Sequence, residues 1–226
     1  MPLILNSKIM NGCELMKIDS NDAYKLLMDA NKMSSGGYIS HSLTVGEAAS
    51  RIAEALNLEP DKARTLGYIH DIGKRYGAPF ELHDIQGYEY LISLGIDEEY
   101  ANICLTHSYL NNDIDCVAGG YIKEDSYKYN FRKEFVKNHK YTIYEKIINL
   151  CDLMCTNEFL LIEERLIDLI TRKGAHTNTQ YHLAQAIQLK ESIDEELGMN
   201  AYNLFPEIIN RLTKDNKDKT MQKKYY

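Results

Sequence analysis

Two adjacent side chains, His70 and Asp71, have the clearest potential for chemistry. Leu66 and Gly67 precede them at helical spacing, which predicts that His70 lies on the buried face of a helix. A carboxylate beside a histidine at an apolar helix end costs free energy unless a partner binds both. Imidazole nitrogen and carboxylate oxygen are good ligands for first-row divalent metals. A metal ion is therefore the simplest partner for this pair.

Two further polar side chains share this apolar setting. His41 lies on the same predicted helical face as Val45, and Asp152 lies between Ile148 and Cys155 on another apolar face. A single inward histidine is more often a hydrogen-bonded core residue, and a single buried aspartate is often a cap or an ion-pair partner. The four together favour a common explanation. The predicted ligands of one metal ion are His41, His70, Asp71 and Asp152.

The order of these residues resembles the HD-domain superfamily of metal-dependent phosphohydrolases. The likeness rests on His41, on the run His70-Asp71-Ile72-Gly73-Lys74 and on Asp152, and it covers about residues 36–160. It implies an all-helical bundle, and it implies that the four matching positions bind metal. The sequence after Asp152, including Glu163-Glu164-Arg165-Leu166 and Arg172-Lys173-Gly174, resembles a subgroup of small bacterial HD proteins without a settled activity.

Two more histidines extend the likeness to family members that bind two metals. His107 falls on an inward face with Ile103, and His83 precedes a predicted helix. In such members two histidines from the part of the chain between Asp71 and Asp152 bind the second ion, and Asp71 would bridge the two ions. The symmetrical diadenosine tetraphosphate hydrolases have a similar length and histidine arrangement, but residues 106–110 depart from that group, so its substrate is not carried over. The alternatives are a surface position for His83 and core packing for His107.

Phosphoryl transfer needs neutralised phosphate oxygens and a water that is nucleophilic near neutral pH, and divalent metals supply both. Asp71 and Lys74 are the predicted catalytic residues: Asp71 would orient the water or accept its proton, and Lys74 would contact a phosphate oxygen as a point charge. Arg75 is a second candidate for binding phosphate. The alternative for Lys74 is a solvated lysine that the helix dipole stabilises.

The stretch 111–140 is weakly patterned and is predicted to form a loop region with one short helix near Lys133. It contains Gly119-Gly120, which give backbone freedom. We predict that it forms a mobile wall over the metals, with Arg132 and Lys133 binding the anionic substrate. The alternative is a surface loop that has no functional role.

The predicted function is hydrolysis of a phosphomonoester or phosphoanhydride in a nucleotide or related small metabolite. The cofactor is one or two divalent ions, with Fe, Mn, Mg, Zn and Ni not distinguished. A carboxylate-bridged pair with several histidines suits iron as well as manganese, so a di-iron oxygenase of the same fold is one alternative. A nucleotide-binding module without turnover is the other.

Helical periodicity dominates the chain, and strand-like alternation is nearly absent. The predicted helices cover residues 21–31, 39–56, 61–73, 84–94, 98–109, 141–155, 158–173, 179–197 and 201–212. The predicted fold is therefore all-α, with one HD-type helical domain over residues 1–213, a metal-binding core at about 36–160 and a polar tail at 214–226. Three histidines lack an inward helical context and are predicted to lie on the surface: His139, His176 and His182.

Bulk composition narrows the class of protein. The 226 residues are 44% hydrophobic and 26% charged, with a net charge of -7, which disfavours a nucleic-acid polymer as partner. No apolar run reaches the roughly 18 residues of a membrane span, and the N-terminus is a poor signal peptide. Five cysteines fit reduced thiols in a cytoplasm better than a disulfide framework. We expect a cytoplasmic protein with a small phosphorylated substrate, and homo-oligomerisation stays open.

Overall fold

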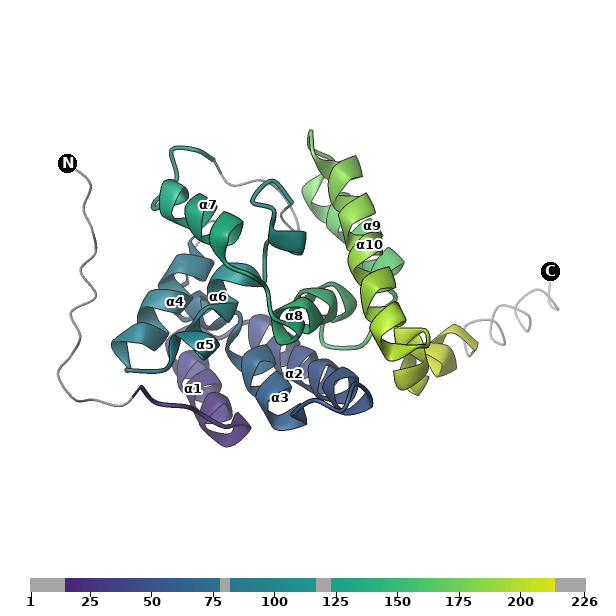
Figure 1. Ribbon diagram of the computed structural model, residues 1–226, viewed down its shortest axis with the longest axis horizontal. Coiled ribbons are helices and arrows are strands. Elements are labelled where there is room, and N and C mark those ends of the chain that lie inside the picture. Colours follow the sequence, from purple (N-terminus) through teal and green to yellow (C-terminus); the bar gives the residue numbers. More distant parts are fainter. Residues whose placement is uncertain (1–14, 78–81, 117–122, 214–226) are drawn as a thin grey trace.

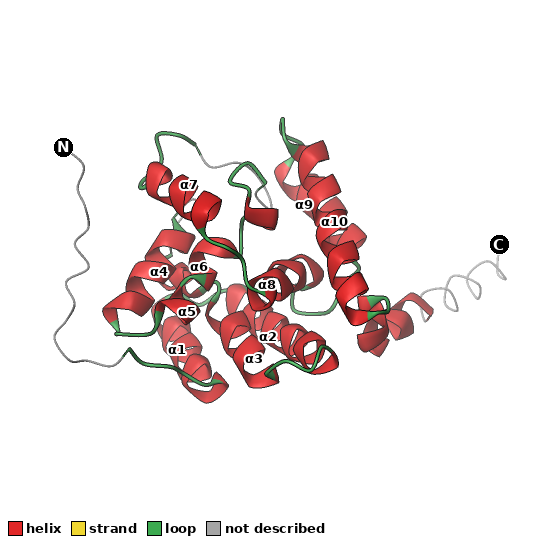
Figure 2. Ribbon diagram, in the orientation of Figure 1, coloured by secondary structure: helices red, strands yellow, loops and turns green. Residues whose placement is uncertain are grey.

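The computed structural model describes residues 15–77, 82–116 and 123–213, and these residues are mostly helical, with no extended strand among them (Figure 2). This confirms the predicted all-α, single-domain fold. The α-helices are α1 (Ser20–Met33), α2 (Tyr38–Ala55), α3 (Pro60–Ile69), α4 (His83–Ser93), α5 (Glu98–Ala101), α6 (Ile103–Thr106), α7 (Tyr129–Asn138), α8 (Ile143–Met154), α9 (Ile162–Lys173) and α10 (Thr179–Leu197). Three short 3-10 helices are η1 (Ile72–Tyr76), η2 (Leu110–Asn112) and η3 (Ala201–Leu204).

The centre of the fold is the close packing of α2 on α3, with α8 against α2 (Figure 1). Two glycines allow the helix backbones to touch: a Cβ atom at Gly67 would lie 2.4 Å from the Cα atom of Gly46. Val45 and Ile52 of α2 and Leu66 of α3 pack into the same core. This close crossing brings the start of α2 beside the end of α3, where the predicted metal ligands lie.

Local sequence fixes where α8 begins. The Thr142 hydroxyl accepts from the Glu145 amide, and the Glu145 carboxylate accepts from the Thr142 amide, which together form a capping box. Ile147, Ile148 and Leu150 then pack into the core. A defined start with a defined apolar face sets the rotation of the helix, and this rotation aims Asp152 at the end of α3.

The end of the α3 region differs from the sequence prediction. The predicted helix 61–73 stops at Ile69, and the chain continues as η1, which Gly77 ends with a φ of 64°. Gly73 serves close packing: a Cβ atom there would lie 1.9 Å from the carbonyl oxygen of His83. The glycine therefore lets η1 seat directly on the start of α4. It does not end the helix, in contrast to the predicted range 61–73.

Other predicted boundaries move by a few residues. The predicted helix 98–109 is divided into α5 and α6, and the segment predicted as 201–212 starts with η3 before a helix at 206–213. The short helix predicted near Lys133 is confirmed as α7. Gly119-Gly120 and the predicted tail at 214–226 lie outside the described residues.

Helices α9 and α10 form a pair along one side of the molecule (Figure 1). The buried residues of α10 recur at helical spacing and begin with His182, followed by Ala186, Leu189 and Ile193. The prediction that His182 lies on the surface is wrong, since 5% of the residue is exposed. Within the described ranges, no helix combines the length and the apolar character that a membrane crossing requires.

Candidate metal centre

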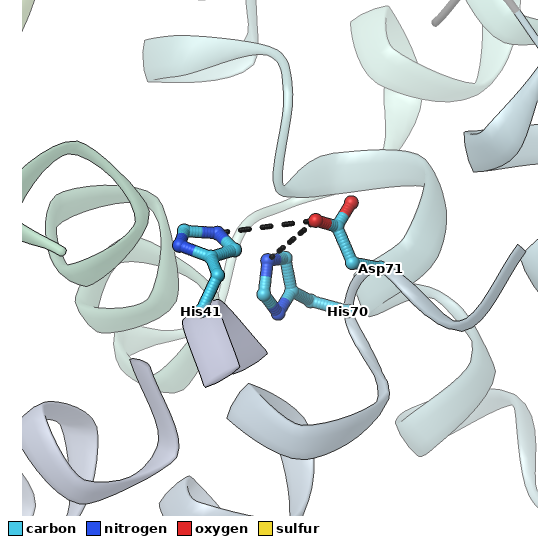
Figure 3. A group of neighbouring side chains, drawn as sticks. All are labelled: His41, His70 and Asp71. Carbon is cyan, nitrogen blue, oxygen red and sulfur yellow. Dashed lines mark ion pairs between the residues drawn. The ribbon is translucent and has the colours of Figure 1, made fainter. Parts of the chain in front are cut away.

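Three of the predicted ligands meet where α2 starts and α3 ends (Figure 3). His41 comes from the first turn of α2, His70 caps α3, and Asp71 follows directly. The Asp71 Oδ2 atom lies 3.5 Å from His70 Nε2 and 3.8 Å from His41 Nε2. Their candidate ligand atoms all lie within 4.8 Å of one another, which is the spacing of a metal site.

The tautomer of His70 suits metal binding. Its Nδ1 atom lies 2.7 Å from the Gly67 carbonyl oxygen, which only accepts, so Nδ1 carries the proton. Burial lowers the pKa of His70 to about 3, so the ring is neutral at pH 7. The Nε2 lone pair is buried without a hydrogen-bond partner and points at the Asp71 carboxylate. Two buried hydrogen-bond acceptors that face each other without a donor cost free energy. A cation bound between them would remove that cost.

Asp71 also faces the other predicted histidine pair. Its Oδ1 atom lies 3.3 Å from His83 Nε2 and 3.5 Å from His107 Nε2. His107 donates from Nδ1 to the Ile103 carbonyl at 3.1 Å, which directs Nε2 inward. Burial lowers the pKa of His83 to about 4. One carboxylate thus presents each of its oxygens to a different group of histidines, which is how a carboxylate bridges two ions.

Asp152 and Lys74 complete the charged surroundings. Asp152 Oδ1 lies 2.9 Å from His41 Nε2 and 3.9 Å from His70 Nε2, and the Lys74 ammonium contacts Asp71 Oδ2. Burial acts to raise the pKa of Asp71, but the Lys74 charge and the imidazoles outweigh it and hold that pKa well below its usual range. Burial likewise acts to raise the pKa of Asp152, and contact with His41 outweighs it. Both carboxyl groups are therefore ionised and suited to bind a cation.

A cavity of about 550 Å³ lies beside these residues. Its lining includes five of the six predicted ligands, namely His41, Asp71, His83, His107 and Asp152. Four cationic side chains line it as well: Lys74, Arg165, Arg172 and Lys173.

The other predicted substrate-binding residues do not line this cavity. Arg75 is buried, with its guanidinium 3.8 Å from the centre of the Tyr90 ring. Arg132 is fully buried against the Asp84 carboxylate, with Nη1 3.1 Å from Oδ1, and Lys133 lies on the exposed side of α7. The structure therefore corrects the prediction that Arg132 and Lys133 bind the anionic substrate.

The cations that line the cavity come mainly from α9, and none of them was among the predicted site residues except Lys74, which precedes α9. Arg165, Leu169, Arg172 and Lys173 share one helical face, because they are spaced by four, three and one residues. This spacing was visible in the sequence as a cationic stripe. Its direction toward the metal ligands was not.

A family model for the HD domain matches residues 38–156, which is more than half of the chain. The chain belongs to the HD-domain family. All six predicted ligands fall within the matched residues, and the histidine and aspartate cluster can hold divalent metal. Family membership and this cluster together support a metal-dependent hydrolase.

Two kinds of relative show narrower likenesses. The Ribonuclease Y proteins of two Ureaplasma parvum serovar 3 strains are 42% identical over 48 residues, which are 21% of this chain and 10% of those proteins. The chain thus matches only a tenth of their length. The HD domain of the phosphodiesterase PgpH from L. monocytogenes, solved with cyclic-di-AMP, has 18% identity and a TM-score of 0.46, over 80% of this chain and 97% of that one.

The packing at Gly73 gives a test of the two-group arrangement. In Gly73→Ala the new Cβ atom meets the His83 carbonyl oxygen at 1.9 Å and the Gly87 amide nitrogen at 2.6 Å, so α4 must move away from η1. We expect a loss of about 1–3 kcal/mol in stability, as for other overpacked sites. We also expect weaker metal binding at the histidine pair that includes His83.

Metal titration of Gly73→Ala by calorimetry measures this effect. Gly95→Ala is the comparison, because an added Cβ atom there meets no other atom within 4 Å. Its φ of 77° means that this substitution costs backbone strain but causes no steric clash. Equal metal affinity at both groups in Gly73→Ala and wild type would show that η1 packing does not place His83.

Proposed function

We propose that the protein hydrolyses a phosphomonoester or phosphoanhydride bond in a nucleotide or a related small phosphorylated metabolite. The observation that carries this proposal is the position of Asp71 between two histidine groups in the lining of a cationic cavity. A volume of about 550 Å³ falls within the range of sites for small molecules. Cationic walls above ionised carboxylates suit a substrate that carries phosphate and binds together with metal.

In this proposal the site residues have two roles, metal binding and neutralisation of phosphate charge. His41, His70, Asp71 and Asp152 hold one divalent cation, and His83, His107 and Asp71 hold a second. Bound divalent cations supply a nucleophilic water near neutral pH and neutralise the phosphate oxygens. Lys74, whose ammonium contacts Asp71 and lines the cavity, neutralises charge on the reacting phosphate.

The Asp71 carboxylate would also orient the attacking water. It stays ionised because of the cationic groups around it, so it can accept a hydrogen bond from that water at neutral pH. The side chain is 2% exposed, which holds it in one orientation between the two histidine groups.

The cationic lining favours hydrolysis of a phosphorylated substrate over the di-iron oxygenase alternative. The ligand set itself serves iron and manganese equally well. Lys74, Arg165 and Lys173 have no evident part in binding oxygen, whereas each can neutralise phosphate charge. The choice between turnover and silent nucleotide binding rests on the kinetic test below.

Removing the metal is expected to abolish phosphate release. The protein should be treated with EDTA, dialysed, and assayed with p-nitrophenyl phosphate and a panel of nucleotides before and after manganese is restored. We expect activity only after metal is restored, because the buried carboxylates and imidazoles have no substitute for the cation.

Two results would replace the proposal. Nucleotide binding without phosphate release by metal-loaded protein would support the silent binding module. Oxygen consumption by protein purified anaerobically with iron would support the oxygenase.

A further inference from the structure

Helix α9 lies beyond residues 38–156, yet one of its faces lines the cavity. We call Arg165, Arg172 and Lys173 the α9 wall. The chain carries a net charge of -7, so a group of cations directed at one cavity is a local departure from the overall field. The metal-binding part of the domain does not need these residues as ligands.

Asp168 orients both arginines of the α9 wall. Its Oδ2 atom lies 2.8 Å from Arg165 Nη1, and its two oxygens lie 2.8 Å from Arg172 Nε and 2.7 Å from Arg172 Nη2. This bidentate contact fixes the plane of the Arg172 guanidinium. The Arg165 Nε atom is buried and has no hydrogen-bond partner. Asp168 offsets part of the charge of the two arginines and fixes how their guanidinium groups lie beside the cavity.

Like charges crowd around this cavity. Burial lowers the pKa of Lys173, and the charges of Arg172, Lys74 and Arg165 lower it further. Cations that disfavour one another in the free protein are stabilised when an anion binds among them. A phosphate group that binds beside the α9 wall would offset this repulsion.

We propose that the α9 wall binds a non-reacting phosphate of a substrate that carries at least two phosphates, while Lys74 and the metal ligands engage the reacting one. This inference rests on the proposed function and narrows it to phosphoanhydrides or multiply phosphorylated metabolites. Lys74 and two divalent cations are enough to bind a substrate with a single phosphate. Such a substrate has no second phosphate to contact the α9 wall. Arginine suits this role because its planar fork binds phosphate oxygens in pairs.

A binding experiment tests the α9 wall without relying on turnover. The probes are inorganic phosphate and methylenediphosphonate, which carries two phosphonates and resists hydrolysis. Calorimetry on manganese-loaded protein gives the ratio of their dissociation constants. We expect wild type to prefer methylenediphosphonate by at least about tenfold, since a charged contact to phosphate is strong. Arg172→Ala/Lys173→Ala should reduce that preference by about tenfold or more.

A charge-matched control is Lys137→Ala/Lys140→Ala, which removes two exposed lysines that do not line the cavity. It should keep the wild-type preference, and because both proteins meet the same free manganese, chelation by the probe cancels in the comparison. The inference is overturned if wild type shows no preference, if neither probe binds, or if the two double variants behave alike.

The same proteins separate this inference from the proposed function. A lasting preference for methylenediphosphonate that depends on the α9 wall, without phosphate release from any substrate, would support the wall and refute hydrolysis. Phosphate release with an unchanged preference in Arg172→Ala/Lys173→Ala would support hydrolysis and refute the wall.

Discussion

Asp71→Asn is expected to lose most of its bound metal and to release phosphate more than about 100-fold more slowly than wild type. Removing a residue that hydrogen-bonds to a metal ligand already lowers metal affinity or activity by about 10–100-fold. The effect should be larger for Asp71, because it faces both histidine groups directly. Asparagine keeps the shape of the side chain, but it removes the charge and replaces one acceptor oxygen with a donor. Elemental analysis gives the metal content per chain, and phosphate release gives the rate.

The control for Asp71→Asn is a carboxylate outside the site. Asp194 lies 2.5 Å from Lys190 and accepts from the Ala201 amide at 2.8 Å, so Asp194→Asn disturbs a comparable set of contacts without touching the cavity. It should keep its metal and its rate. Circular dichroism should show native helix content in both variants. Full turnover with Asp71→Asn would falsify the bridging assignment.

Helical periodicity predicts that His41, His70 and Asp152 point inward, whereas the family resemblance supplied the second histidine pair, His83 and His107. His41 and Asp152 sit on apolar helical faces, and each face must be buried against another helix. Polar residues on such faces therefore gather inside the fold. The geometry places the His41 and Asp152 side chains 2.9 Å apart, although they are far apart in the sequence.

Helical periodicity could not identify the group that pairs with a buried arginine. Tyr129, Arg132 and Val136 are all buried on one face of α7, so the periodicity alone indicates an inward arginine. Such an arginine serves either a substrate or a buried carboxylate. The choice depends on Asp84, which precedes Arg132 by 48 residues, and local sequence does not encode that contact.

The α9 wall was missed for a related reason. A cationic stripe on an amphipathic helix is typical of a solvated surface, and Arg172 is in fact partly exposed. Whether the stripe faces water or a cavity depends on the path of residues 155–161 between α8 and α9. That connection is not helical in the structure, although residues 158–161 were predicted as the start of the helix, so its direction is set by packing between distant segments.

Arg132→Met is expected to destabilise the fold by about 3–5 kcal/mol, because it leaves the Asp84 carboxylate buried without its ion-pair partner. Arg132 Nη1 lies 3.1 Å and 3.2 Å from the two Asp84 oxygens, and its Nη2 atom donates to the Ser126 hydroxyl and the Tyr127 carbonyl. In a chain of this size such a loss lowers the melting temperature by about 6–20 °C. Calorimetry measures the shift.

The double variant Arg132→Met/Asp84→Asn isolates the buried charge. Asparagine removes the unpaired carboxylate and can still accept from the Tyr109 hydroxyl, which lies 2.8 Å from Asp84 Oδ2. We expect it to recover part of the stability that Arg132→Met loses, whereas independent sites would lose more together than apart. Asp84 follows His83, and Tyr109 lies two residues after His107, so metal binding at that histidine pair should weaken and recover in parallel. A melting temperature within about 2 °C of wild type in Arg132→Met would contradict a structural ion pair.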